Sequence, residues 1–111
     1  DNGWGSPEYY AMMTRLDNSI AEIFKALEKA GMIDDTMVII TADHGGKGTG
    51  HGGTSMSEMQ SPLIIWGKGV QRATTITDMV VSYNIAPTIA RALGLKTPSC
   101  WRGRAVTQAL R

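Results

Sequence analysis

One glycine-rich segment, residues 41–53, carries the side chains with the most specific chemistry. Asp43 and His44 are adjacent, His51 follows seven residues later, and these two histidines are the only ones in the chain. Divalent transition metals such as zinc use carboxylate and imidazole ligands, and a site needs three or four of them around one ion. Six glycines between Asp43 and Gly53 permit positive φ angles and a close approach of the backbone to a ligand. The segment indicates a metal site; the alternative is a surface loop with a capping Asp43 and two solvated histidines.

The residues just before this segment place it at the end of a strand. Thr36-Met37-Val38-Ile39-Ile40-Thr41 is a short, nearly continuous apolar run. This pattern is typical of a strand that is buried on both faces of a parallel sheet. Ligands of open α/β sheets bind just beyond the carboxyl ends of the strands. Asp43 and His44 are therefore expected at the edge where such a fold has its chemistry.

The composition bounds the class of protein. The chain has 111 residues, with 42% hydrophobic and 19% charged residues, as in an ordinary soluble globular domain. A net charge of +1 gives no general attraction to nucleic acid or to an anionic membrane, so no nucleic-acid-specific binding is expected. No apolar run is long enough for a membrane span. A single cysteine, Cys100, excludes an internal disulfide and a cysteine-based structural zinc site. The start at Asp1, without a signal-peptide pattern, predicts a processed product or a fragment.

A long amphipathic helix is predicted before the first strand. Ser6 is suited to the N-cap and Pro7 to the first helical position, while Gly31 is a natural left-handed cap at the other end. Apolar residues recur between them at three- and four-residue steps and form one face that should turn toward a core. They are Met13, Leu16, Ile20, Ile23, Phe24 and Leu27.

Shorter elements follow the glycine-rich segment. Residues 54–60 have room for a helical turn or two, and Pro62-Leu63-Ile64-Ile65-Trp66 predicts a second buried strand. A short strand is possible within residues 74–82. Residues 84–95 predict a helix that Asn84 caps and Gly94 stops. The element order is that of an α/β fold.

Two apolar strands cannot make a stable parallel sheet by themselves, because each would lack neighbours. The missing strands must come from elsewhere. Residues 1–111 are therefore predicted to be the C-terminal portion of one larger α/β domain whose N-terminal portion is absent.

Competing motifs in the same region fit less well. Residues 48–53 match the dinucleotide fingerprint G-x-G-x-x-G, but Pro62 leaves no room for the helix that this motif requires. Ser55 and Ser57 do not lie in a G-x-S-x-G nucleophile elbow, and we interpret both as ordinary loop serines. We interpret Glu58 as a solvated helix residue rather than a general base.

Taken together, these segments resemble the alkaline phosphatase superfamily, and within it the nucleotide pyrophosphatase/phosphodiesterase and sulfatase-like branches. The most specific likeness is the pair Asp43-His44-Gly45 and His51-Gly52-Gly53. Further likeness lies in Tyr10 to Gly69 as a whole, in Asn84-Ile85-Ala86-Pro87-Thr88, and in the C-terminal residues up to Arg104.

The resemblance implies a three-layer α/β sandwich with a mostly parallel sheet and two divalent cations, with Zn²⁺ expected and Ca²⁺ or Mn²⁺ as alternatives. It implies that Asp43 and His44 ligate one ion and that His51 ligates the other. The hydroxyl nucleophile, an Asp near the N-terminus and an Asp-x-x-x-His pair of the family have no match in this sequence. The chain is similar to the part of the family that begins just after that pair.

The implied activity is metal-dependent hydrolysis of phosphate esters or diesters, with a small-molecule phosphate or sulfate ester as substrate and only part of the site in this chain. A sulfatase, which usually uses one calcium ion and a modified Cys or Ser, is the first alternative. Cys100-Trp101-Arg102 lacks its C/S-x-P-x-R motif because Arg102 stands where Pro belongs. A non-catalytic metal-binding or interaction module is the second. The resemblance also implies an extracytoplasmic location; the sequence gives no indication of the oligomeric state.

Overall fold

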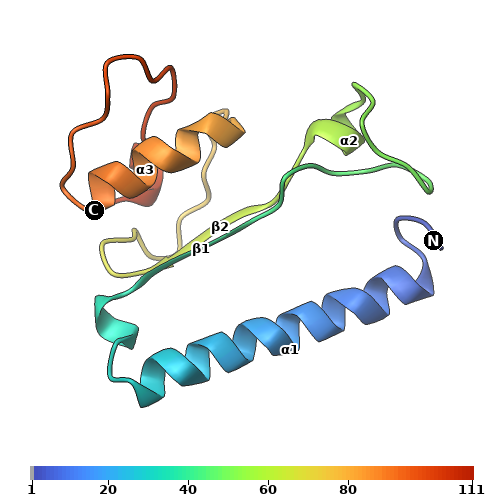
Figure 1. Cartoon of the computed structure of the whole chain (residues 1–111), viewed down its shortest axis with the longest axis horizontal. Helices are drawn as coiled ribbons and strands as arrows, with labels where there is room; N and C mark the ends of the chain where they lie inside the picture. Colours follow the sequence, from blue (N-terminus) through green and yellow to red (C-terminus); the bar gives the residue numbers. More distant parts are fainter. Residues whose placement is uncertain (1) are drawn as a thin grey trace.

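The computed structural model describes residues 2–111. Its elements are α1 (Pro7–Lys29), β1 (Met37–Thr41), α2 (Met56–Met59), β2 (Leu63–Gly67) and α3 (Ile85–Ala92), with short 3-10 turns at Ile33–Asp35, Ser82–Asn84 and Thr107–Ala109. The two strands lie next to each other, α1 runs alongside them, and α3 with the C-terminal segment lies on their other side (Figure 1). The predicted α/β class is confirmed for this piece of chain.

The residues at the two ends of α1 set its bounds as predicted. The hydroxyl oxygen of Ser6 accepts a hydrogen bond from the backbone N–H of Tyr9 at 3.1 Å, and Pro7 begins the helix. Gly31 takes a φ of +67° after the last turn, where a residue with a Cβ would be strained. The helix is held to the strands by Phe24, whose ring lies 5.0 Å from that of Trp66 in an edge-to-face arrangement.

The direction of the sheet differs from the prediction. β1 and β2 pair antiparallel, with Met37 opposite Gly67 and Thr41 opposite Leu63, so a parallel arrangement of these two strands is wrong. The reason lies in the connection between them. A parallel pair needs a crossover that returns the chain to the start of the first strand, usually on a helix. The link from Thr41 to Leu63 holds only the four-residue α2 and stays at the carboxyl end of β1. The larger, mostly parallel sheet and the three-layer sandwich stay predictions.

Burial is lower than the apolar patterns predicted. No residue of α1 is buried, and of its apolar stripe only Ile20, Phe24 and Leu27 are even half-buried. β1 is half-buried from Met37 to Ile40 and exposed at Thr41, rather than buried on both faces. A two-stranded sheet has too little surface to cover such a helix. Full burial would need the further strands that the sequence indicated.

The small core lies instead between α3 and the C-terminal residues. It includes Val70, Thr88, Ala90, Val106 and Ala109, each at most 8% exposed, and the buried Pro87. The helix α3 ends at Ala92 before Gly94, whose φ is +68°, as predicted. Asn84 occupies the predicted N-cap position, but its side chain makes no capping hydrogen bond, because the chain already turns at Ser82–Asn84.

The predicted strand within residues 74–82 is absent from the described chain. The backbone N–H groups of Thr77 and Asp78 donate to the side-chain oxygen of Gln108 at 2.9 and 3.2 Å instead of to a neighbouring strand. None of the helices in residues 2–111 combines the length and the apolar character needed to cross a bilayer.

Candidate metal centre

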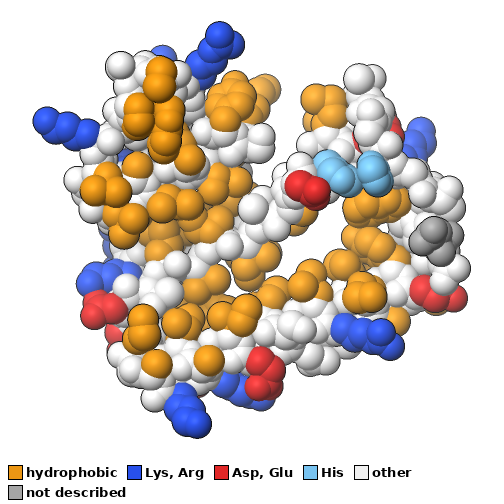
Figure 2. Space-filling model, viewed as in Figure 1, with side chains coloured by type: hydrophobic (Ala, Val, Ile, Leu, Met, Phe, Trp, Pro, Cys, Tyr) orange, Lys and Arg blue, Asp and Glu red, His pale blue; other side chains and the backbone are white. Residues whose placement is uncertain are grey.

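The glycine-rich loop begins where β1 ends, at the edge that the sequence predicted for chemistry. Both histidine side chains are next to each other on the molecular surface (Figure 2). Their ring centroids are 4.5 Å apart and their planes are inclined by 37°. The loop therefore folds back so that His51 comes to lie beside His44.

The geometry of Asp43 and His44 leaves one free ligand atom on each. The backbone N–H of His44 donates to Oδ1 of Asp43 at 2.9 Å, and Oδ2 lies 3.5 Å from Nε2 of His44. The carbonyl oxygen of Gly45 lies 2.7 Å from Nδ1 of His44. Since a carbonyl can only accept, a neutral His44 ring carries its proton on Nδ1 and has its lone pair on Nε2. The loop thus presents one carboxylate oxygen and one imidazole nitrogen side by side.

These donor atoms fit a divalent cation. Zinc ligands at about 2.0–2.1 Å in a tetrahedral site lie roughly 3.3 Å apart. The separation of 3.5 Å between Oδ2 of Asp43 and Nε2 of His44 is close to that value. Asp43 is 87% exposed and His44 39% exposed at their side chains, so an ion can reach both.

The described chain does not close a metal site by itself. Among residues 2–111, no three His, Cys, Asp or Glu side chains form a group that could hold one ion. The sequence predicts that Asp43, His44 and His51 contribute only some of the ligands of such a site. Their roles as ligands stay predictions.

Close packing of Gly45 against α2 fixes the position of His44. Gly45 is buried, and its N–H donates to the carbonyl oxygen of Glu58 at 2.9 Å. A Cβ on Gly45 would come within 3.0 Å of the carbonyl oxygens of Ser57 and Gln60. Only glycine fits between these backbone atoms, so α2 sets the direction in which His44 leaves β1.

Glu58 holds the second half of the loop, a role that the sequence interpretation missed. Its Oε1 accepts from the N–H of Gly53 at 3.0 Å, and its Oε2 accepts from the hydroxyl of Ser55 at 2.5 Å. The Ser55 hydroxyl first, and the Gly53 N–H next, lower the pKa of this carboxyl below its usual range. The spacing Ser55-x-x-Glu58 is that of a capping box and could have revealed this role. Glu58 is therefore a tether for the His51-Gly52-Gly53 segment rather than a free helix residue.

Trp4 packs against the glycine-rich loop at Gly46 and Gly48. Its backbone N–H donates to the carbonyl oxygen of Gly48 at 2.7 Å, and its indole lies so close to Gly46 that any Cβ there would clash with the ring. Tyr9 supports the indole at a centroid distance of 5.4 Å. No short sequence pattern signals this contact, because 42 positions separate Trp4 from Gly46.

The structure also decides between the competing motifs. The helix after residues 48–53 is α2, which has four residues, so the dinucleotide fingerprint lacks the helix on which a pyrophosphate would rest. Ser55 occupies the N-cap position of α2. Neither feature offers a binding site that competes with the Asp43–His44–His51 cluster.

Comparison with known proteins gives one consistent result. Residues 6–95 match the sequence model of the family described as Sulfatase. Over 95 residues, 81% of this chain, the sequence is 36% identical to arylsulfatase K of Bos taurus. It is 26% identical over 101 residues, 86% of the chain, to the extracellular sulfatase SULF-1 homolog of Drosophila melanogaster. It is 31% identical over 105 residues, 88% of the chain, to the multifunctional alkaline phosphatase superfamily protein PehA of Trinickia caryophylli.

The chain spans only a small part of these relatives: 18% of the bovine protein, 9% of the fly protein and 20% of the bacterial one. The relatives favour the sulfatase alternative over the phosphodiesterase interpretation that came first from the sequence. The matched residues include the whole loop that carries Asp43, His44 and His51.

Proposed function

This chain belongs to the sulfatase family, and on that premise we propose that the full-length protein hydrolyses sulfate esters. The family match over residues 6–95 carries the proposal. It is supported by relatives that are themselves named as sulfatases. The residues of this chain supply part of the site, and the nucleophile lies outside it.

Asp43 and His44 are proposed to hold a divalent cation through Oδ2 and Nε2, and His51 to hold a second one. The 3.5 Å between the first two atoms and the tautomer set by Gly45 support this assignment. Imidazole nitrogen favours a transition metal, so Zn²⁺ is the expected ion, with Ca²⁺ or Mn²⁺ as the alternatives. A bound cation supplies positive charge that stabilises the oxygens of the ester and lowers the pKa of the attacking hydroxyl.

The chain's own residues position these ligands. Gly45 packs on α2 and thereby sets the direction of His44. Glu58 accepts hydrogen bonds from Gly53 and Ser55 and thereby holds the segment after His51 in place. Trp4 presses on the loop from the other side. Because these candidate ligands are held in place, the loop has to rearrange less when a cation binds.

The test compares ester classes on the full-length protein. Purified protein is assayed with p-nitrophenyl sulfate, p-nitrophenyl phosphate and bis-p-nitrophenyl phosphate, before and after complete chelation, and its metal is identified by elemental analysis. We expect the sulfate ester to be the best substrate, and readdition of the metal to restore activity. Faster turnover of the phosphodiester would favour the phosphodiesterase interpretation. Turnover that survives chelation would contradict the metal assignment.

A pair of variants tests the ligand assignment separately. His44→Ala is expected to lose metal in elemental analysis, whereas Gly50→Ala in the same loop, where a Cβ meets nothing within 4 Å, is expected to keep it. Equal metal content in both variants would show that His44 is not a ligand.

We also propose an extracytoplasmic location. One relative is named as an extracellular sulfatase, and the resemblance implied such a location. Fractionation of cells that express the full-length protein with its native N-terminus, followed by immunodetection, tests this; recovery in the cytoplasmic fraction alone would contradict it.

A further inference from the structure

Two backbone hydrogen bonds fold the middle of the glycine-rich loop into a tight turn. The N–H of Lys47 donates to the carbonyl oxygen of Gly50, and the N–H of Gly50 donates to that of Lys47, both at 3.1 Å. Gly48, between them, has a φ of +60°, which suits the second position of the turns that close tight β-hairpins. The turn reverses the chain between the candidate ligands His44 and His51, whose ring centroids lie 4.5 Å apart.

The residues just before α1 hold this turn. Figure 1 shows the N-terminal end of α1 next to the loop between β1 and α2. The backbone N–H of Trp4 donates to the carbonyl oxygen of Gly48 at 2.7 Å. The N–H of Ser6, the N-cap of α1, donates to the carbonyl oxygen of Gly3 at 3.3 Å, so residues 3–6 form a turn of their own. The tip of the loop is thus joined to the start of the helix.

Gly3 leaves no room for a side chain at this contact. A Cβ on Gly3 would lie 2.9 Å from the carbonyl oxygen of Gly48 and 3.4 Å from Cγ2 of Thr49. The φ of Gly3 is +84°, in the left-handed region that favours glycine. Gly31, at the other end of α1, also has a positive φ, but a Cβ there would meet no other part of the described chain within 4 Å. The two glycines therefore differ in their contact with the loop and share the need for a positive φ.

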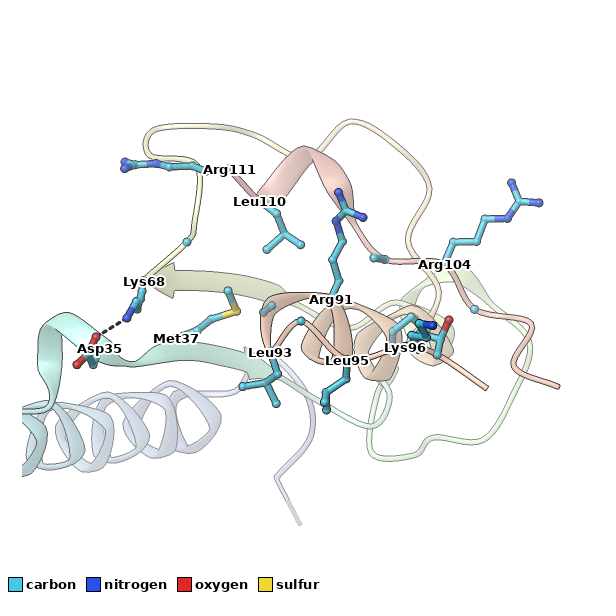
Figure 3. Close-up of a pocket in the computed structure, with 17 residues that line it drawn as sticks. Asp35, Met37, Lys68, Arg91, Leu93, Leu95, Lys96, Arg104, Leu110 and Arg111 are labelled. Carbon is cyan, nitrogen blue, oxygen red and sulfur yellow. Dashed lines mark hydrogen bonds and ion pairs between the residues drawn. The ribbon is translucent and has the colours of Figure 1, made fainter. Parts of the chain in front are cut away.

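The opposite end of the hairpin has a contact of a different kind. Lys68, just after β2, forms an ion pair with Asp35, just before β1 (Figure 3). Their side chains are 62% and 78% exposed, and water and salt screen such exposed pairs. The pair lies roughly 17 Å from the glycine-rich loop, the length of a five-residue strand. The ion pair therefore does not position His44 or His51, and it provides a control for the contacts that do.

We propose that Gly3 is a positioning residue of the candidate metal centre, a role that rests on the proposed function for the presence of a cation there. Gly3 lets the chain before α1 come close enough for the hydrogen bond from Trp4 to Gly48. That bond holds the turn of the loop, and with it the two histidines side by side, before a cation binds. Because the loop is ordered in advance, binding requires less rearrangement.

A methyl group at Gly3 would act on the loop through its tip. The carbonyl of Gly48 belongs to the backbone and cannot rotate away, so the tip of the loop must move to restore ordinary contact, which begins at 3.4 Å. The movement stretches the bond from Trp4 and shifts the turn that sets His51 beside His44. Gly3→Ala should therefore loosen the loop and weaken cation binding together.

The experiment compares Gly3→Ala with Gly31→Ala in the full-length protein. Both variants place alanine at a positive φ, so both should lose a similar amount of thermal stability, but only Gly3→Ala meets the loop. Asp35→Asn, which removes the ion pair at the opposite end of the hairpin, is a second control. Amide hydrogen exchange of residues 45–53 is measured after chelation, and Zn²⁺ affinity is measured by competition with a chromophoric chelator. Neither measurement needs ester hydrolysis.

We expect Gly3→Ala to speed exchange of the Lys47 and Gly50 amides about two- to tenfold, the factor that follows from the loss of one hydrogen bond. Its Zn²⁺ affinity should fall about tenfold, as is typical when a residue that supports a metal ligand is lost. Both controls should stay within about threefold of the parent protein in both measurements, as changes away from a site usually do. If Gly3→Ala does not fold, Trp4→Phe replaces it, because the smaller ring loses part of its contact with Gly46 and should weaken Zn²⁺ binding in the same direction.

Three results would overturn the proposal. Equal effects in Gly3→Ala and Gly31→Ala would reflect backbone strain alone. Unchanged loop exchange or unchanged Zn²⁺ affinity in the test variant would show that the contact does not position the ligands. A parent protein that binds no Zn²⁺ would leave no centre to position. If the expected differences appear but no ester releases sulfate, the proposed function fails while the role of Gly3 stands.

Discussion

The substitution Gly45→Ala tests whether α2 positions the candidate metal centre. The new Cβ would lie 2.5 Å from the carbonyl oxygen of Gln60 and closer still to that of Ser57, whereas ordinary contact begins at 3.4 Å. Loop and helix must therefore separate by about 1 Å, because both neighbours are backbone atoms that cannot rotate away. The separation also stretches the 2.9 Å hydrogen bond from Gly45 to Glu58.

Both effects have expected magnitudes. Overpacking of this kind costs about 1–3 kcal/mol of unfolding free energy. A displacement of about 1 Å at a ligand can reduce the rate of catalysis by roughly a hundredfold. We expect Gly45→Ala in the full-length protein to lower the denaturant midpoint and to reduce kcat for p-nitrophenyl sulfate about a hundredfold.

The control comes from the same loop. Gly50→Ala adds the same methyl group where nothing lies within 4 Å, and Gly50 does not have a positive φ. Its midpoint and kcat should match those of the parent protein. If the two variants behave alike, α2 does not position His44 and the account of the site is wrong.

Three further predictions concern the contacts that hold the loop and the core. Trp4→Ala should weaken metal retention and lower the unfolding free energy by about 1–3 kcal/mol, a smaller loss than at a fully buried tryptophan because Trp4 is 40% exposed. Trp101→Ala, at a similarly exposed residue, is the control and should leave metal retention unchanged. The pKa of Glu58 is lowered in the folded chain, so its stabilisation is present above the usual glutamate pKa and is lost as the pH falls through the folded value. Glu58→Gln should therefore show a flatter dependence of stability on pH in acid titrations monitored by circular dichroism, and an unchanged slope would contradict the tether. Thr88→Val leaves the buried N–H of Val106 without a partner and should cost about 1–3 kcal/mol in chemical denaturation; a cost near zero would mean that this hydrogen bond does not anchor the C-terminal segment.

Local features of the fold were predictable from the sequence because their causes are local. Ser6, Pro7 and Gly31 mark the ends of α1 through capping geometry that depends on a few neighbouring residues. The apolar runs located β1 and β2 to within one residue. Their antiparallel direction was missed because the path of the connection, rather than the strand residues, determines direction.

The sequence predicted that the three candidate ligand residues lie close together, but it did not predict the contacts that support them. Asp43, His44 and His51 stand out by residue type, and the structure brings them together. The tether from Glu58 was visible as a capping-box spacing but was interpreted as a solvated side chain. The contact between Trp4 and the loop joins residues far apart in sequence, and no local pattern encodes such a contact.

The antiparallel hairpin makes two parts of this protein separately adjustable. Met37 pairs with Gly67 and Thr41 with Leu63, so the glycine-rich loop leaves one end of the hairpin and the segment that leads to Val70 of the small core leaves the other. Effects of substitutions more than about 10 Å apart usually add, and a five-residue strand spans roughly 17 Å, so the losses of unfolding free energy in Gly45→Ala and Thr88→Val should sum in the double variant. Changes in the C-terminal segment can therefore accumulate without disturbing the contacts around the loop.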